Sequence, residues 1–338
     1  MIFSIYALGE KLVYERNALA LKLEDRWIWD SWYVWDGDVC HAFYLCASKG
    51  LGDPDRRHRY TNVGHATSLD LENWTILPDA LSPSDSPAFD SWTTWTGSVV
   101  RADDGNWWMF YTGTSREDGG DIQTIGAAVS KDLMSWKKYS AQPLLSADPE
   151  WYEVLDKSVW HDQAWRDPWV FRGPDSSWHM LVTARSKIGD PKTRGAMGHA
   201  VSSDLVNWTV LQPLAVSEGD FGQLEVFQFE VVDGVPIVLF CCGYRELSAK
   251  RRAAFGDRDA TYSLVCEPGL SKIDFSRARP FAAELVYAAR LVQKPLGGWY
   301  LLGFINEVDG VFVGEICDPI PVTADPEQGL VLRGGNKI

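Results

Sequence analysis

The sequence contains few of the residue patterns that mark metal, redox or membrane proteins. Six histidines and six cysteines are spread over 338 residues, with neither a Cys-x-x-Cys pair nor a His-Glu-x-x-His motif. No apolar run reaches the roughly 18 residues needed to span a bilayer. These absences argue against a zinc site and a transmembrane helix, so we expect neither a metal nor any other cofactor.

Positive charge is also scarce. Lys and Arg number 32 against 46 Asp and Glu, which gives a formal net charge of −14. Such a surface repels a phosphate backbone and an anionic membrane, so nucleic acid and membranes are not expected partners. The N-terminus lacks the basic stretch of a secretory signal, and the cysteine spacing indicates buried thiols rather than disulfides. We therefore expect a cytoplasmic protein.

Aromatic residues are abundant, with 17 Trp, 12 Tyr and 14 Phe. A hydrophobic content of 46% excludes a disordered chain. The aromatic side chains are consistent with packing in an all-β core. A second interpretation is a surface on which flat apolar faces of a ligand stack, such as those of sugar rings.

One motif, Ser-x-Asp-Leu-x-x-Trp, occurs three times, at residues 68–74, 130–136 and 202–208. Its tryptophans lie 62 and 72 residues apart. Such a period fits one blade of a β-propeller, about four strands with their loops. A chain of this length accommodates about five such blades. The motif tryptophans themselves are expected to pack between strands.

Five hairpin signals support that count. Turn pairs occur at 36–37, 104–105, 175–176, 233–234 and 297–298, followed by strand-like runs at 40–45, 107–111, 178–183, 235–241 and 299–304. The prediction is an all-β fold: a single five-bladed β-propeller over residues 1–338, with four-stranded antiparallel blades, a central active-site funnel and no C-terminal β-sandwich domain. A β-sandwich fold is the alternative, but it does not explain the repeated motif.

Three acids occupy nearly equivalent places in this repeat. Asp30 lies six residues before its turn, and Asp167 and Glu225 each lie eight residues before theirs. First strands of blades line the central channel, so these carboxylates are expected to converge at one mouth. The alternative is that each forms a structural ion pair, for example with Arg166. Because unpaired buried acids are costly, three in register favour a functional site.

Converging carboxylates flanked by tryptophans suit glycoside hydrolysis, in which one acid donates a proton and another attacks or activates water. Apolar neighbours and nearby Asp charges would disfavour the ionised form of Glu225, which suits it to the acid role. The indoles beside the acids are the candidates for sugar stacking: Trp29, Trp32, Trp95 and Trp165. The basic stretch 250–252 is expected to be a solvated loop, with a site for a phosphorylated sugar or for a partner subunit as the alternative.

The order of these motifs resembles the five-bladed furanosidase propellers of glycoside hydrolase family 32 and, more distantly, families 68, 43 and 62. The resemblance rests on Trp-Ile-Trp-Asp (27–30), the segment 64–74, Thr-Gly-Ser (96–98), Phe-Tyr-Thr-Gly (110–113), Arg-Asp-Pro (166–168), Leu-Glu (224–225) and Tyr-Ala (287–288). It implies that Asp30 is the nucleophile, Asp167 the transition-state stabiliser and Glu225 the general acid/base. It also implies substrate-binding or orienting roles for Ser98, Arg166 and Tyr287.

The sequence departs from the family pattern around Asp30, where Trp-Asp-Ser-Trp-Tyr (29–33) replaces Asn-Asp-Pro-Asn-Gly, and at three further positions. Leu45, Val63 and Val226 stand where the family carries glutamine, tryptophan and cysteine. These positions shape the substrate pocket, so the sequence constrains the chemistry more tightly than the sugar.

Three hypotheses remain open at this point. The first is a retaining glycosidase that removes a terminal β-fructofuranosyl or related furanosyl residue from a small saccharide, with transfer differing only in the acceptor. The second is an inverting α-arabinofuranosidase or β-xylosidase in which Asp30 is the general base. The third is a sugar-binding propeller without catalysis. A carboxyl separation of about 5–5.5 Å indicates retention, and about 6.5–9.5 Å indicates inversion.

Overall fold

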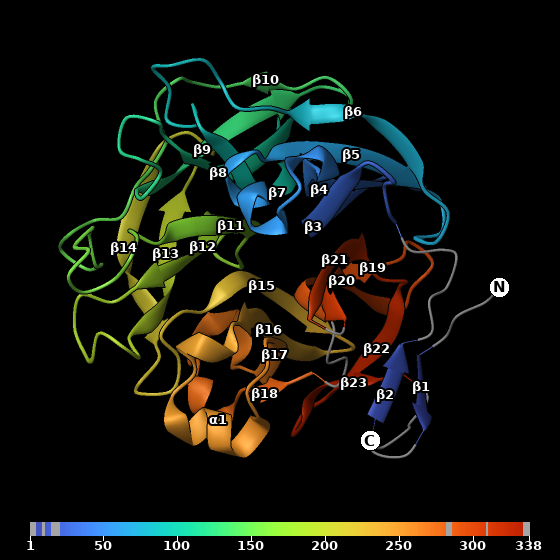
Figure 1. Cartoon of the computed structure of the whole chain (residues 1–338), viewed down its shortest axis with the longest axis vertical. Coiled ribbons are helices and arrows are strands. Elements are labelled where there is room, and N and C mark those ends of the chain that lie inside the picture. Colours follow the sequence, from blue (N-terminus) through green and yellow to red (C-terminus); the bar gives the residue numbers. More distant parts are fainter. Residues whose placement is uncertain (1–4, 9–10, 15–20, 282–285, 309, 334–338) are drawn as a thin grey trace.

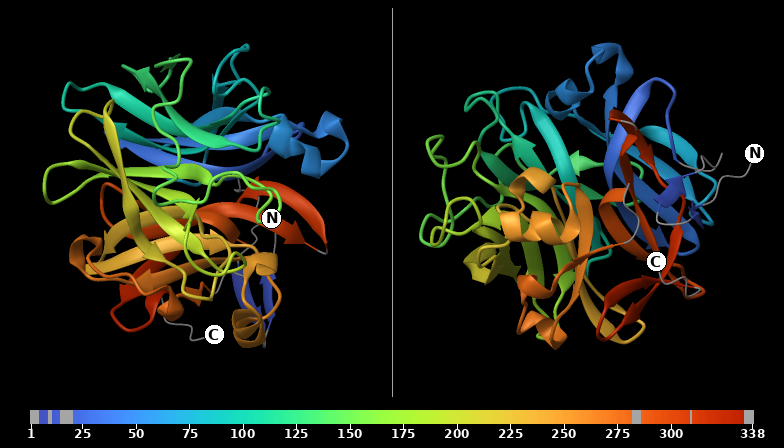
Figure 2. Two further views of the ribbon diagram at one scale, coloured as in Figure 1. Left: turned by 90° about the vertical axis from the view of Figure 1, so that its left-hand side faces the viewer. Right: turned by 60° about the horizontal axis from the view of Figure 1, so that its bottom comes forward.

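The computed structural model describes residues 5–8, 11–14, 21–281, 286–308 and 310–333. Five antiparallel sheets are arranged around a central channel, as Figure 1 shows face-on and Figure 2 from two other sides. The predicted all-β, five-bladed propeller is therefore confirmed. The first four sheets have four strands each, and the fifth has one additional strand.

The strands follow one another outward from the channel in each blade. Blade one is β3 (Arg26–Asp36), β4 (Val39–Ser48), β5 (Asn62–Ser68) and β6 (Thr75–Leu81); blade two is β7 (Thr93–Arg101), β8 (Trp107–Thr114), β9 (Gln123–Ser130) and β10 (Lys137–Lys138). Blade three is β11 (Trp165–Arg172), β12 (Trp178–Arg185), β13 (Gly195–Ser202) and β14 (Trp208–Val216); blade four is β15 (Glu225–Val232), β16 (Val235–Cys242), β17 (Ala260–Val265) and β18 (Arg279–Pro280).

Blade five contains β19 (Val286–Gln293), β20 (Trp299–Val308), β22 (Ile320–Asp325) and β23 (Gly329–Leu332), with β21 (Val311–Ile316) paired to β20. A separate hairpin contains β1 (Ile5–Leu8) and β2 (Lys11–Tyr14). Helices are short: α1 (Ala249–Phe255) and the 3₁₀ turns η1 (Lys49–Leu51), η2 (Pro54–Arg59), η3 (Tyr244–Glu246), η4 (Pro268–Leu270) and η5 (Phe275–Arg277). In the part of the chain described, no helix is long and apolar enough to cross a membrane.

The innermost strands close the ring. Each of β3, β7, β11, β15 and β19 packs against the next, and β19 packs against β3. The strand β21 also packs on β3, and the Ile316 amide donates to the Leu21 carbonyl at 3.0 Å. The last blade thus packs against the first, and a backbone hydrogen bond joins it to the segment that precedes β3.

The repeated motif forms the turn between the third and fourth strands of a blade. The Ser68 hydroxyl accepts from the Leu71 amide at 2.9 Å, and the Asp70 carboxylate accepts from the next two amides along the chain. Leu71 has a φ of 68°, a conformation that these side-chain hydrogen bonds stabilise. The two contacts of the carboxylate recur at Asp132 and Asp204.

Two of the three motif tryptophans pack against the neighbouring blade, whereas Trp74 lies against Tyr33 of its own blade. Trp136 of blade two packs edge-on against Phe43 of blade one, with ring centroids 5.5 Å apart. Trp208 of blade three meets Phe110 of blade two in the same way, also at 5.5 Å. These contacts support the expected structural role of the repeat.

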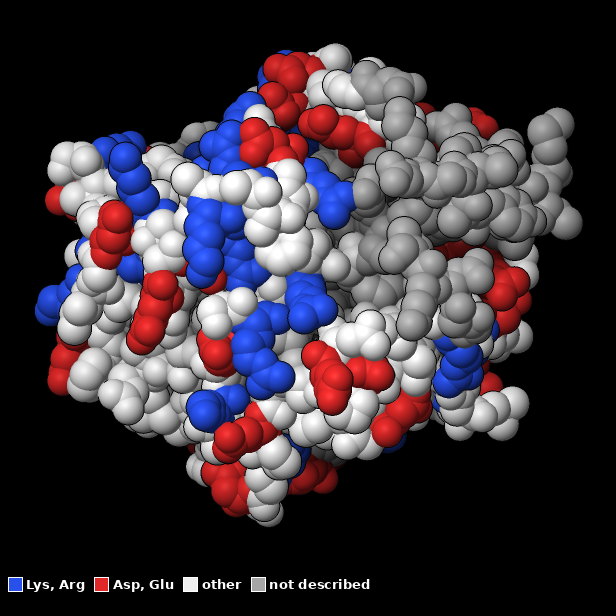
Figure 3. Space-filling view, turned by 90° about the horizontal axis from the view of Figure 1, so that it is seen from below, with Lys and Arg blue, Asp and Glu red and all other residues white. Residues whose placement is uncertain are grey.

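The basic stretch 250–252 was expected to be a loop, and that prediction is wrong. Ser248 caps the short helix α1 there, and its hydroxyl accepts from the Arg251 amide. Arg251 is buried and donates to the carbonyls of Phe275 and Ala278, while Arg252 pairs with Asp257 at 2.6 Å. Figure 3 shows that basic and acidic side chains are interspersed on this side of the molecule.

Candidate active site

A β-bulge interrupts the innermost strand of every blade. The register shifts fall between Trp29 and Ser31, Trp95 and Gly97, Arg166 and Trp169, Glu225 and Gln228, and Tyr287 and Arg290. A bulge breaks the alternation of side chains and turns residues toward a new direction. Asp167 and Val226 take left-handed φ values of 58° and 57° within two of these bulges.

The bulges bring the three predicted acids to one pocket. This pocket has a volume of about 190 Å³ and is lined by Trp29, Asp30, Leu45, His58, Trp95, Thr96, Gln123, Asp162, Arg166, Asp167, Glu225, Val226 and Tyr287. Sites for drug-sized ligands commonly occupy about 300–1,000 Å³. The volume therefore suits one small ring. We call Asp30, Asp167 and Glu225 the site carboxylates.

Asp30 lies in the bulge of β3, where the Thr96 hydroxyl donates to its Oδ2. Burial and the charge of Asp167 raise the pKa of Asp30 to about 7, against the lowering effect of the Thr96 hydrogen bond. The group therefore changes charge near neutral pH.

Asp167 is 3% exposed. Its Oδ2 accepts from the Thr183 hydroxyl at 2.9 Å and lies 3.4 Å from Arg166 Nε. Burial raises the pKa of Asp167 above its ordinary value, while the Arg166 charge acts in the opposite direction. The charge of Glu225 adds to this rise, as the charge of Asp167 does for Asp30.

Glu225 is held by two hydrogen-bond donors. The prediction that its carboxyl has apolar surroundings is therefore wrong. Arg166 Nη2 donates to Oε1, and the Tyr287 hydroxyl donates to Oε2 at 2.7 Å. Of its neighbours in sequence, Val226 lines the pocket, but Leu224 and Phe227 are buried in the core of blade four. The carboxyl therefore has a fixed position rather than an apolar cage.

Arg166 is itself anchored. Its Nη1 donates to Gln123 Oε1 at 2.9 Å, and the Gln123 amide donates to Asp162 Oδ2 at 2.7 Å. Burial alone would lower the pKa of Arg166, but the surrounding carboxylates Glu225, Asp162 and Asp167 raise it. The guanidinium stays charged beside Glu225.

Two threonines that the sequence did not indicate connect the acids through the backbone. Thr112 Oγ1 accepts from the Asp167 amide at 2.9 Å and donates to the Thr96 carbonyl at 3.2 Å. Thr183 Oγ1 donates to Asp167 and accepts from the Val226 amide at 3.2 Å. Both threonines are fully buried. Their hydroxyls satisfy the amides that the bulges leave without a strand partner.

Arg290 is a second group that sequence reasoning missed. It is 1% exposed, and its Nη1 donates to the carbonyls of Val226 and Phe227. Burial lowers the pKa of Arg290 to about 10, against the nearby charges of Asp167 and Asp30. The only available signal was its place just after the Tyr287-Ala288 pair.

The substrate-contact predictions divide into two groups. Trp29, Trp95, Arg166 and Tyr287 line the pocket, as expected. Three others do not line it: Trp32, Ser98 and Trp165 are at most 1% exposed.

These three residues have structural roles instead. Trp32 stacks on Phe43, Trp165 packs on Tyr152, and the Ser98 hydroxyl accepts from the Val170 amide. Their burial corrects the expectation that they contact sugar.

Within the described ranges, no group of three or more His, Cys, Asp or Glu residues is arranged to hold a metal ion.

Comparisons with known proteins identify the family to which the chain is similar. The family description "Glycosyl hydrolases family 32 N-terminal domain" matches residues 33–311. A 6(G)-fructosyltransferase from Asparagus officinalis is 31% identical over 182 residues, 52% of this chain and 28% of that protein. A sucrose-6-phosphate hydrolase from Bacillus subtilis is 33% identical over 155 residues, 45% of this chain and 28% of that protein. The matched region is thus less than a third of either relative.

Solved structures support the fold. A family 32 β-fructofuranosidase from Bombyx mori superposes with a TM-score of 0.70 at 20% identity, covering 93% of this chain and 64% of that one. An inulosucrase from Halalkalicoccus jeotgali, bound to kestose, gives a TM-score of 0.68 at 19% identity and covers 96% of both chains. At such identities the likeness concerns the fold alone.

Proposed function

The chain belongs to glycosyl hydrolases family 32, and from this premise we propose that it is a retaining glycosidase acting on the terminal β-fructofuranosyl residue of a small saccharide. The observation that carries the proposal is the convergence of the site carboxylates in one pocket. Glycoside cleavage needs a proton donor and a second carboxylate on either side of the scissile bond.

In the proposed mechanism, Asp30 attacks the anomeric carbon of the fructosyl unit. Glu225 donates a proton to the leaving oxygen, and a covalent fructosyl-enzyme forms. Water, deprotonated by Glu225, then attacks the same carbon and releases Asp30. When a sugar hydroxyl takes the place of water, the product is a transfer product.

The surrounding groups support this division of roles. The Tyr287 hydroxyl donates to ionised Glu225 and can accept from its protonated form, so one contact serves both halves of the cycle. Asp167 faces the charge that develops on the sugar ring, and Thr183 fixes its orientation. Electrostatic stabilisation by such a fixed group is commonly a large part of catalysis.

We also propose that the protein works in the cytoplasm. All six cysteines are buried and unpaired, which is typical of proteins that fold in a reducing compartment.

The test is a turnover assay with a panel of sucrose, sucrose phosphorylated on one sugar, short inulin and levan oligomers, and aryl arabinofuranosides. Release of fructose or fructosyl-transfer products supports the proposal. Turnover confined to arabinofuranosides would overturn the sugar assignment, and binding without turnover of any member would overturn catalysis.

A further inference from the structure

A second and larger hollow lies on blade three. It has a volume of about 810 Å³. We call it the blade-three groove, and its lining includes Glu150, Trp151, Ile188, Arg194, Gln212 and Glu218. It shares no lining residue with the pocket that contains the site carboxylates, which we call the catalytic pocket.

The groove and the catalytic pocket both have lining residues at the same end of blade three. Register pairs Trp165 of β11 with Ala184 of β12, Arg185 with Gly195 of β13, and Ala196 with Val216 of β14. The start of β11, which carries Arg166 and Asp167, therefore lies level with the strand ends that frame the groove. Neighbouring strands are about 4.8 Å apart, so β11 lies about 10–14 Å from β13 and β14.

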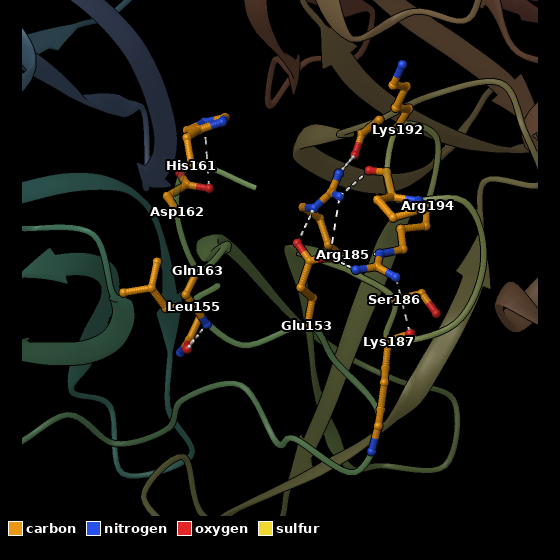
Figure 4. A network of polar contacts seen from close by, with 12 residues as sticks. Glu153, Leu155, His161, Asp162, Gln163, Arg185, Ser186, Lys187, Lys192 and Arg194 are labelled. Carbon is orange, nitrogen blue, oxygen red and sulfur yellow. Dashed lines mark hydrogen bonds and ion pairs between the residues drawn. The ribbon is translucent and has the colours of Figure 1, made fainter. Parts of the chain in front are cut away.

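A buried ion-pair network lies beside the groove and includes Arg194 of its lining (Figure 4). Glu153 Oε1 accepts from Arg185 Nε at 2.7 Å, and its Oε2 accepts from Arg194 Nε at 2.7 Å. Arg185 also donates to the carbonyls of Gly222 and Pro191 and lies 3.5 Å from the Trp160 ring centroid. The loop that carries Ile188 is therefore tied to its neighbours before any ligand arrives.

The exposed chemistry of the groove suits a neutral, hydroxyl-rich ligand. Trp151 is 36% exposed and Ile188 is 80% exposed, which offers an apolar face for stacking. Gln212 and Glu218 are exposed, and their side chains form no hydrogen bond with any residue that the structure describes. With Glu150 and Asp190 also present, the acidic rim disfavours phosphate groups and offers acceptors to sugar hydroxyls.

We propose that the blade-three groove is a distal saccharide subsite, which binds an inner unit of an oligofructoside whose terminal unit occupies the catalytic pocket. This inference rests on the proposed function and adds that the substrate is an oligosaccharide chain. The catalytic pocket holds a single ring, whereas the groove has a volume within the range usual for larger ligands. Binding energy from the groove is thus available only to chains long enough to reach it.

The experiment compares Trp151→Ala, Trp151→Phe and wild type on sucrose and on inulin and levan oligomers of increasing length. Trp151→Ala is expected to lower kcat/KM on long oligomers about five- to tenfold and to leave sucrose within about twofold. Trp151→Phe, which keeps an aromatic ring, recovers most of the difference. Tyr139→Ala removes an exposed ring from blade two and serves as the matched control, with no change in the chain-length profile.

An equal effect of Trp151→Ala on sucrose and on long oligomers would overturn the subsite. Failure of the wild type to turn over any fructoside would instead contradict the proposed function. In that case, saturation-transfer NMR of an inulin oligomer with wild type and Trp151→Ala decides the groove separately. Loss of the ligand signal in the variant supports the groove, and an unchanged signal overturns it.

Discussion

Two sets of acidic residues in this propeller have the same side-chain chemistry and opposite settings. The turn aspartates Asp132 and Asp204 are exposed, and backbone amides two and three residues later hold the pKa of each below its ordinary value. In the site set, burial raises the pKa of Asp30 and Asp167. The first arrangement stabilises the ionised carboxylate and closes a turn at the rim of a blade. The second disfavours the ionised carboxylates that lie at the channel.

Backbone geometry accounts for the difference. In the turns, the aspartate accepts from its own segment, so the contact is local and repeats with the motif. At the site, each acid lies on a bulged inner strand and receives a donor from another blade or strand. A recurring acid in a repeat protein therefore stabilises the fold when its hydrogen-bond donors belong to its own segment.

The largest effect is expected at the site set. Asp30→Asn should lower kcat on a cleaved fructoside on the order of 10⁴-fold or more, because the covalent step loses its nucleophile. Circular dichroism and the melting temperature should show an intact fold. Wild-type turnover in a pure preparation of this variant would remove Asp30 from the mechanism.

A smaller effect is expected from the groups that position the acids. Thr183→Val should leave the Asp167 carboxylate and the Val226 amide each without one buried partner, costing about 1–3 kcal/mol of folding stability and at least about tenfold in kcat. Thr183→Ser keeps the hydroxyl and should restore kcat. A purely structural role would lower stability in Thr183→Val without changing kcat or its pH profile.

The pH profile tests the electrostatic half of the comparison. Because the nucleophile must be ionised, kcat/KM should rise with pH through an apparent pKa near 7. Thr96→Val removes the hydrogen bond that opposes the rise in the Asp30 pKa, so the acidic limb of the pH profile should move to higher pH. Thr96→Ser keeps the hydroxyl and should leave that limb in place. A limb that stays fixed in Thr96→Val contradicts the assignment.

Folding stability should depend on the ionisation of Asp30 in the opposite direction, so that it falls as the pH rises. Since folding favours protonated Asp30, its contribution to stability is greatest below the unfolded pKa near 4 and declines as the pH rises toward 7. Chemical denaturation of wild type and Asp30→Asn across this range measures the difference. Identical slopes for the two proteins would contradict the raised pKa.

The smallest effect belongs to the turn set. Asp204→Ala removes the acceptor of two backbone amides, and we expect a loss of folding stability on the order of 1 kcal/mol with kcat unchanged. Denaturant titration and a turnover assay check both parts. A large loss of kcat would break the distinction between the two sets.

The sequence predicted the blades well because their signals are local. The hairpin turns and the Ser-x-Asp-Leu-x-x-Trp motif depend on residues within a few positions of one another, and all five predicted hairpins are present. The convergence of the site carboxylates also followed from their register in the repeat.

Side-chain direction at the site could not be predicted in the same way. Alternation along a strand would send Trp29 and Asp30 to opposite faces, but the bulge between Trp29 and Ser31 lets both line the pocket. The partners of the acids were hidden for another reason: Thr112, Thr183 and Arg290 come from distant parts of the chain. Nothing near the acids in sequence identifies them.

The stereochemistry of cleavage shows directly whether Asp30 acts as a nucleophile in a retaining mechanism. Time-resolved NMR of the wild-type protein with a β-fructofuranoside records the anomer released before mutarotation. We expect β-fructofuranose to appear first, because two displacements at the same carbon restore the configuration. First appearance of the α-anomer would show a single displacement and would make Asp30 a general base instead of a nucleophile.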